Sequence, residues 1–192
     1  MITEITGPKI KRIHPKKFAL WMALVSMIMF FTALTSAYIV RKAAGNWYAF
    51  EIPKEFFLSG GVALVNSVLL HVAYRLYKER NYTIFKLLIS LGFVLGVAFV
   101  VLQYLGWLAL NGQGVYAQTN QSSSFFLILT LSHGLHVIGA ITALMVSWIY
   151  AIRPSTTAWT EKRQLRLELT FTFWHFVDIL WIYLLIFFWV QQ

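Results

Sequence analysis

Long apolar runs with few formal charges dominate the chain, and their lengths predict helices that cross a membrane. A helix needs about 20 apolar residues to span about 30 Å of hydrocarbon. The runs predict five spans, at about residues 18–40, 56–77, 87–110, 125–150 and 168–190. Residues 87–152 contain no Asp, Glu, Lys or Arg, but the polar stretch 111–124 predicts a loop that divides this run into two helices. The expected fold is therefore all-α, a polytopic membrane protein built as a bundle of five transmembrane helices.

The pattern divides the chain into an N-terminal cytoplasmic tail over residues 1–17 and a five-helix transmembrane domain over residues 18–192. The first span is too long for the apolar segment of a signal peptide, and no small-residue cleavage motif follows it. It is therefore expected to stay as the first helix. The prolines lie outside the predicted spans, at Pro8, Pro15, Pro53 and Pro154.

Composition agrees with this interpretation, and the charges add an orientation. Only 12% of the residues are charged and 59% are hydrophobic, whereas soluble domains contain about 25% charged residues. The formal net charge is +9, and of the 16 Lys and Arg residues all but Arg41, Lys42 and Lys54 fall on one side of the predicted spans. Because basic residues collect in cytoplasmic segments, we expect the N-terminus in the cytoplasm and the C-terminus in the periplasm of a bacterial inner membrane.

The same composition excludes several classes of function. The absence of cysteine excludes structural disulfides, thiolate zinc sites, iron–sulfur clusters and cysteine nucleophiles. Basic residues that orient membrane spans do not indicate a nucleic-acid partner, so none is expected. The chain contains no phosphate-binding loop, nucleophile elbow or HExxH motif. With no redox centre in its sequence, the chain is not expected to catalyse a reaction alone.

Ionisable side chains within the predicted spans are few, and they are the candidate functional residues. Each costs about 2.5–3.5 kcal/mol at membrane depth, so such residues face protein or water. Glu168, His175 and Asp178 share one face of the last helix, which we expect to point inward. The opposite face is expected to contact lipid or a partner subunit, and it carries Phe173, Val177, Leu180, Leu184 and Phe188.

Counting 1.5 Å per residue places two pairs of these candidates at similar depths. His71 and His175 are expected to lie level, at a depth where a hydrogen bond between them is a hypothesis. His136 and Asp178 both fall near the midplane, where an imidazole–carboxylate pair would reduce the cost of burying either group. Stripes of Gly, Ala and Ser on the second, third and fourth helices predict close helix packing.

These residues leave three interpretations open. The simplest is a tightly packed bundle whose few polar groups bond to one another. His71 and His175 on different helices would also suit a b-type haem, as in a membrane anchor subunit of a quinone-linked oxidoreductase. Asp178 and Glu168 would suit a proton-coupled transporter, although the chain shows neither an internal repeat nor a broken helix.

Two segments carry a resemblance to a known family. SFF at 124–126 followed by HGLHVIG at 133–139 resembles the fourth helix of five-helix forms of cytochrome c oxidase subunit III. Glu168 followed by WHFVD at 174–178 and by Trp181 resembles the last helix of that family. The resemblance covers all five spans, with weaker similarities at Phe30, Phe31, Ala37, Tyr38, Gln103 and Trp107.

The resemblance implies a non-catalytic core subunit of a haem–copper terminal oxidase, which reduces oxygen to water in aerobic respiration. Subunit I of such an oxidase holds the haems and the copper, so no cofactor is expected on this chain apart from bound phospholipid. The implied partners are subunit I, the other oxidase subunits, membrane lipids and a larger respiratory supercomplex. The implied role is to support the stability, lipid binding and oxygen or proton access of subunit I.

Carried onto this sequence, the resemblance assigns no catalytic residue and no metal ligand. It gives a set of polar positions that we expect to bind lipid or to stabilise the interior: His71, Gln103, His133, His136, Glu168, Trp174, His175 and Asp178. The chain departs from the family at two positions that commonly carry a glutamate, where it has Met27 and Gly106. These positions therefore supply no acidic group here.

Overall fold

The computed structural model describes residues 14–116, 120–153 and 160–191. Within these residues the chain forms no strand and five α-helices: α1 (Pro15–Ala43), α2 (Lys54–Lys78), α3 (Tyr82–Gly112), α4 (Gln121–Ile152) and α5 (Glu161–Gln191). All five are long and apolar enough to cross a membrane, which confirms the predicted all-α fold. Most of the predicted tail, residues 1–13, lies outside the described residues, and the tail's last residues already belong to α1.

The helices are longer than the apolar runs that predicted them. α3 continues to Gly112 and α4 begins at Gln121, so the loop between them is shorter than the predicted 111–124. The reason is a capping box, in which the Asn120 side chain accepts from the Ser122 amide and Ser123 Oγ accepts from the Asn120 amide, both at 3.2 Å. Polar residues that suggest a loop therefore begin a helix here.

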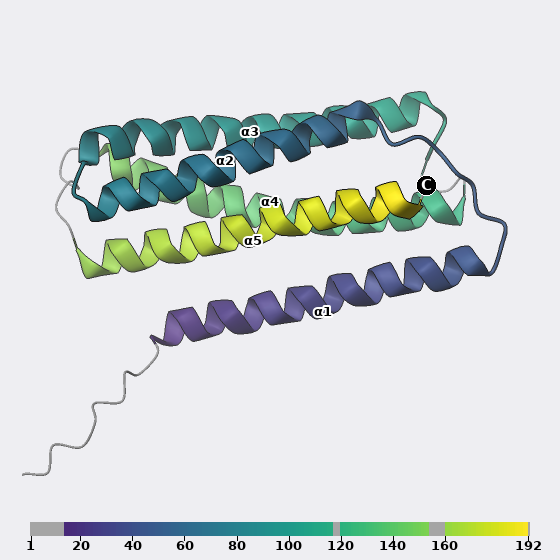
Figure 1. The fold of residues 1–192 in the computed structure, drawn as a ribbon, viewed down its shortest axis with the longest axis horizontal. Coiled ribbons are helices and arrows are strands. Elements are labelled where there is room, and N and C mark those ends of the chain that lie inside the picture. The colour runs from purple at the N-terminus through teal and green to yellow at the C-terminus, as the bar shows by residue number, and fades with distance from the viewer. Residues whose placement is uncertain (1–13, 117–119, 154–159, 192) are drawn as a thin grey trace, which may run out of the picture.

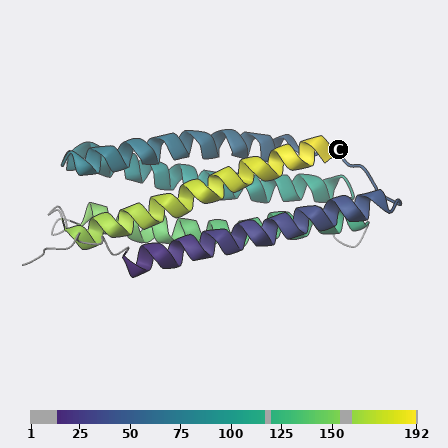
Figure 2. The same ribbon diagram turned by 60° about the horizontal axis from the view of Figure 1, so that its bottom comes forward.

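Four of the helices form a ring, and the fifth packs on its outside. Neighbours around the ring are α2 with α3, α3 with α4, α4 with α5, and α5 with α2. α1 contacts only α4 and α5, and Figures 1 and 2 show it running alongside the ring and away from α2 and α3. Successive helices run in opposite directions, so α1, α3 and α5 begin at the same end of the molecule (Figure 1).

The predicted glycine stripe on α3 lies where this helix approaches its neighbours. A Cβ atom on Gly106 would lie 2.9 Å from the ring of Phe56 on α2, and one on Gly96 would lie 2.8 Å from the ring of Trp174 on α5. In lipid, where apolar surface gives no drive between helices, such close backbone packing supplies much of the association. The small residues on α3 are therefore packing positions.

α5 is more enclosed than its sequence pattern suggests, and one prediction about it is wrong. Its supposed lipid-facing side is buried or half-buried, with Val177, Leu180, Leu184 and Phe188 each no more than 7% exposed. The reason is that α5 contacts three helices, α1, α2 and α4, whereas the prediction allowed for only one protein-facing side. The exposed large apolar residues of α5 are Ile179, Tyr183, Ile186, Trp189 and Val190.

Candidate functional site

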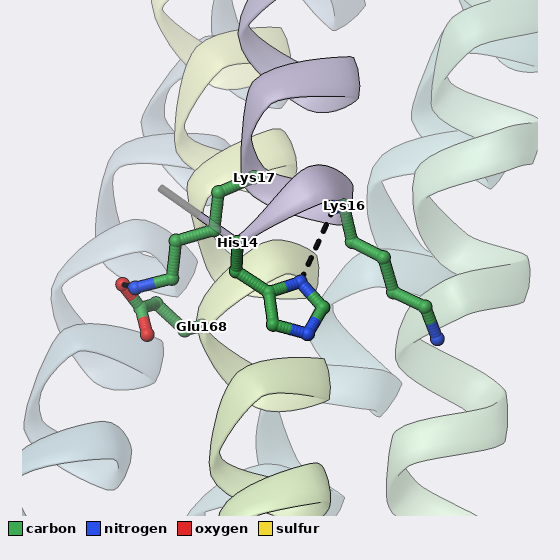
Figure 3. Close-up of polar contacts among 4 residues, drawn as sticks. All are labelled: His14, Lys16, Lys17 and Glu168. Carbon is green, nitrogen blue, oxygen red and sulfur yellow. Dashed lines mark hydrogen bonds and ion pairs between the residues drawn. The ribbon is translucent and has the colours of Figure 1, made fainter. Parts of the chain in front are cut away.

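Glu168 lies at the end of the ring where α5 begins, and it forms an ion pair with α1. Figure 3 shows Lys17 extending from the first turn of α1 to this carboxylate, with Nζ 2.5 Å from Oε1. The local start of α1 sets the geometry: Pro15 occupies the first turn, and His14 Nδ1 accepts a hydrogen bond from the Lys16 amide at 3.2 Å. Both side chains of the ion pair are about one-third exposed, 36% for Lys17 and 35% for Glu168. Glu168 therefore fastens α1 to α5 and does not join the buried groups of α5.

His71 and His175 lie level with each other, as their depths predict. Their ring centroids are 6.2 Å apart across the α2–α5 contact. The hydrogen bond of His175, however, joins its Nδ1 to Ser67 Oγ at 2.5 Å, and His71 stays on the exposed side of α2. Ser67, which lies one turn before His71 on α2, therefore forms the hydrogen bond to His175 that was considered for His71.

Asp178 and Trp174 are two buried polar side chains about one turn apart on α5. Asp178 is 6% exposed and Trp174 is 3% exposed. The Asp178 carboxylate interacts with the indole N–H of Trp174, but neither Asp178 Oδ2 nor Trp174 Nε1 has a hydrogen bond of normal geometry within the described residues. A buried polar atom without a partner costs about 1–3 kcal/mol, so these atoms do not serve the packing of the isolated chain.

The expected pair between His136 and Asp178 does not form in the described part of the chain. His136 Nδ1 donates to the carbonyl oxygen of Ser132, 2.7 Å away on its own helix, and its ring meets the edge of Phe31 at a centroid distance of 5.8 Å. The prediction was wrong because equal depth says nothing of helix rotation, and this face of α4 turns toward α1.

His133 occupies the centre of the ring, stacked on Trp181 of α5. The two ring centroids are 4.9 Å apart with the planes at 21°, and His133 is 1% exposed. Neither ring nitrogen of His133 has a hydrogen-bond partner in the residues that the structure covers. Its interactions there are therefore aromatic packing contacts.

Ser59 on α2 joins three helices next to this stack, and the sequence analysis did not single it out. Trp181 Nε1 and Gln103 Nε2 each donate to Ser59 Oγ at 3.0 Å, and Ser59 Oγ donates to the Phe56 carbonyl at 2.6 Å. Ser59 immediately precedes the two glycines Gly60 and Gly61 on α2. In that sequence context a serine suggests only another small residue for close helix packing. Its position opposite Gln103, a candidate residue on the next helix, was the feature that could have identified Ser59 as a functional residue.

A lateral groove between α3 and α4 lies beside this centre. It has a volume of about 240 Å³, and Gln103, Trp107 and His133 are among its lining residues. Much of the remaining lining is apolar and outward-facing, including the exposed side chains of Leu131, Leu135 and Ile138. The groove is therefore mostly apolar, and the candidate residues Gln103 and His133 lie on its inner wall.

The arrangement defines a class of protein before any relative is considered. Five apolar helices enclose polar side chains, only some of which form hydrogen bonds within the described residues, and the outer surface carries many large apolar groups. Among the described residues, no group of three or more His, Cys, Asp or Glu side chains could hold a metal ion. This is a polytopic membrane protein with a packed interior that contains polar side chains.

The comparisons with known proteins identify the family. No family model matches the chain. It is 30% identical over 173 residues to the "Probable cytochrome c oxidase subunit 3" of Nocardia farcinica, covering 85% of this chain and 80% of that protein. It is 26% identical to the "Cytochrome bo(3) ubiquinol oxidase subunit 3" of Buchnera aphidicola, covering 85% of each. It is also 24% identical to the "Probable quinol oxidase subunit 3" of Staphylococcus haemolyticus, covering 88% of this chain and 85% of that protein.

The chain belongs to the cytochrome c oxidase subunit III family. It is a subunit III of a haem–copper oxidase, and the interpretations as a haem-binding membrane anchor or a proton-coupled transporter are not favoured. A complex with other oxidase subunits follows from this membership.

Proposed function

We propose that this subunit flanks the catalytic subunit I of its oxidase and supports that subunit's stability, phospholipid binding and access to oxygen and protons. Haem and copper would then be held by partner subunits. The electron donor would be met there too, whether cytochrome c or a quinol, as in the names of the relatives. The proposed location is a bacterial inner membrane with the N-terminus in the cytoplasm, in line with the excess of basic residues on that side.

The observation that carries this proposal is the state of Asp178. Its carboxylate is buried within the ring, and its interaction with Trp174 on α5 leaves both Asp178 Oδ2 and Trp174 Nε1 without a hydrogen bond of normal geometry in the described residues. Burying such a group costs free energy that the chain's own packing does not return. A role for Asp178 in the assembled oxidase, toward lipid, protons or a neighbouring subunit, explains why it is there.

Phospholipid binding is supported by the lateral groove between α3 and α4. An apolar slot of about 240 Å³ suits part of an acyl chain, and its outer wall is formed by exposed apolar side chains. The polar candidates Gln103 and His133 line the inner wall. They would fix the depth at which a lipid or another apolar molecule is held.

The test is substitution of Asp178 in the complete oxidase, purified in mild detergent. Asp178→Leu is expected to lower the amount of this chain and of phospholipid that copurifies per haem, while the haem absorbance of the surviving oxidase stays unchanged. His175→Leu, which removes the bond to Ser67, is expected to act in the same direction. A haem spectrum lost from a complex that still contains this chain would contradict the proposal.

A measurement on the isolated chain separates this role from simple folding. Because Asp178 Oδ2 has no hydrogen bond of normal geometry in the described residues, Asp178→Leu is expected to leave the unfolding temperature of the purified chain unchanged or higher. Ile179→Leu on the exposed side of α5 is the matched control, and it should change neither readout. A large loss of stability in Asp178→Leu would show that the carboxylate serves the fold itself.

A further inference from the structure

A pocket at one end of the ring gathers basic and aromatic side chains from all four ring helices. It lies where α2 and α4 end and where α3 and α5 begin. We call it the basic pocket and define it by Tyr77 (α2), Lys86 (α3), Tyr150 (α4), Arg163 and Arg166 (α5). None of the eight candidates of the polar interior lines it, so it is a separate site.

The charges of the basic pocket have one sign. Lys86, Arg163 and Arg166 line it, and among the described residues of its lining none is Asp or Glu. Arg166 lies over the ring of Tyr150, with its guanidinium carbon 4.3 Å from the ring centroid. Cations held together at a membrane boundary repel one another unless an anion comes between them. The lining of the pocket therefore concentrates positive charge at this end of the ring.

The floor of the pocket contains a hydroxyl without a partner. Tyr77 is 5% exposed and is packed against the rings of Tyr82 and Phe85, with centroids 5.9 Å and 5.0 Å away. Its hydroxyl oxygen is buried and forms no hydrogen bond within the described residues. A buried hydroxyl is expensive to leave unpaired, so a group from outside the chain is the natural acceptor for its proton.

The size of the pocket limits what this group can be. The free space is about 30 Å³, which exceeds what a water molecule requires and is far too small for an acyl chain. A compact polar group can enter while any attached chains stay outside. Lys86 is half-buried, and Arg166 and Tyr150 are exposed, so the rim is open to the end of the bundle.

We propose that the basic pocket binds a phosphate-bearing anion, with Lys86, Arg163 and Arg166 supplying positive charge and the Tyr77 hydroxyl donating a hydrogen bond. Arginine and lysine at membrane boundaries favour phosphate because charge-assisted hydrogen bonds to its oxygens are strong. The phosphate has two sources, the headgroup of an anionic phospholipid in the surrounding leaflet or a soluble phosphate compound. The chemistry at the pocket is the same for both.

The test uses the purified full chain in neutral detergent, with native mass spectrometry counting bound phosphatidylglycerol. Wild-type chain is expected to retain phosphatidylglycerol in preference to zwitterionic phosphatidylcholine. Arg166→Gln and Lys86→Gln should each weaken phosphatidylglycerol binding by about fivefold. Tyr77→Phe removes only the hydroxyl and should also weaken it, by about fivefold to tenfold.

Two matched controls lie at the same end of α2 outside the pocket. Arg75→Gln makes the same change of charge on an exposed residue, and Tyr74→Phe makes the same loss of a hydroxyl. Both should bind phosphatidylglycerol as the wild type does. Equal unfolding temperatures of all variants without added lipid verify that the fold is intact.

A second arm adds inorganic phosphate and so distinguishes the two sources. Retention of phosphatidylglycerol in the presence of phosphate assigns the pocket to the lipid headgroup, and displacement assigns it to a soluble phosphate compound. The proposal is overturned if the pocket variants bind phosphatidylglycerol as tightly as the wild type. It is equally overturned if phosphatidylcholine binds as well as phosphatidylglycerol.

Discussion

The α2–α3 pair and the α1 helix show two ways of holding helices together in a membrane. α3 approaches α2 through glycines, so that Gly92 lies against Leu70 and Asn66, and Gly106 lies against the ring of Phe56. α1 has no contact with either helix and buries only one stripe of its surface, Leu24, Met27, Phe31, Thr35 and Tyr38. Close backbone packing joins α2 to α3, whereas α1 packs on the outside of the ring against α4 and α5.

Polar bonds spaced along α1 take the place of close packing. Lys17 pairs with Glu168 near one end, and Thr35 Oγ1 lies 3.0 Å from the Tyr183 hydroxyl further along. At the other end Lys42 donates to the carbonyl oxygen of Gln191. Lipid offers no hydrophobic drive between helices, so an outer helix depends on such bonds and on shape. The comparison therefore predicts global effects from changes in the ring and local effects from changes at α1.

The largest effect is expected from Gly106→Glu, which places a carboxylate where α3 packs against the ring of Phe56 on α2. The new Cβ would lie 2.9 Å from the ring of Phe56, which is 0% exposed and is packed against Phe126 and Trp181. Overpacking and a carboxylate buried without a partner together should lower the free energy of unfolding by about 3 kcal/mol or more. Unfolding of the purified chain by increasing dodecyl sulfate in mixed micelles measures this loss.

The steric part of that effect can be isolated with alanine. Gly106→Ala should cost about 1–3 kcal/mol, because the same ring must move. Gly61→Ala on α2 is the control, since a Cβ there meets nothing within 4 Å, and it should be neutral or slightly stabilising. If both alanine variants behave alike, close packing is not what joins α2 to α3.

An intermediate effect is expected from Ser59→Ala, which removes a hydroxyl that forms several hydrogen bonds and adds no volume. Trp181 and Gln103 would each lose their acceptor, and the indole of Trp181 is 0% exposed. The free energy of unfolding should fall by about 1–3 kcal/mol, measured in the same mixed micelles. Thr142→Ala serves as the control, because among the described residues that exposed hydroxyl bonds to the carbonyl of Ile138 on its own helix. Equal stability of the two variants would show that the hydrogen bonds of Ser59 to Trp181 and Gln103 do not stabilise the ring.

The number and order of the helices could be predicted because each depends on one property, the length of an apolar run. Helix ends could not, since residues such as Asn120 are polar in both loops and caps, and only the backbone geometry decides between them. The lipid-facing side of α5 could not either. Apolar residues surround that helix, and only its three neighbours show which of them are buried.

The sequence predicted which residues are candidates better than it predicted which of them contact one another. Intramembrane cost alone selects His133, His175 and Asp178, and the structure places all three within or against the ring. Which groups meet depends on helix rotation, so His136 turned out to face Phe31. Ser59 escaped notice because a small hydroxyl residue costs little in a membrane helix and gives no signal by itself.

The smallest effect is expected at α1, from Lys17→Gln. The pair with Glu168 is partly exposed, and such pairs contribute below about 1 kcal/mol. Unfolding of the ring should therefore hardly change, whereas the first turns of α1 should exchange amide hydrogens faster in hydrogen–deuterium exchange. Lys16→Gln is the matched control, because Figure 3 shows Lys16 pointing away from Glu168. The exchanged pair Lys17→Glu with Glu168→Lys should restore slow exchange, since it rebuilds the ion pair with its polarity reversed. If Lys17→Gln instead destabilised the ring as strongly as Ser59→Ala, α1 would be an integral part of the ring, and the distinction between the two regions would fail.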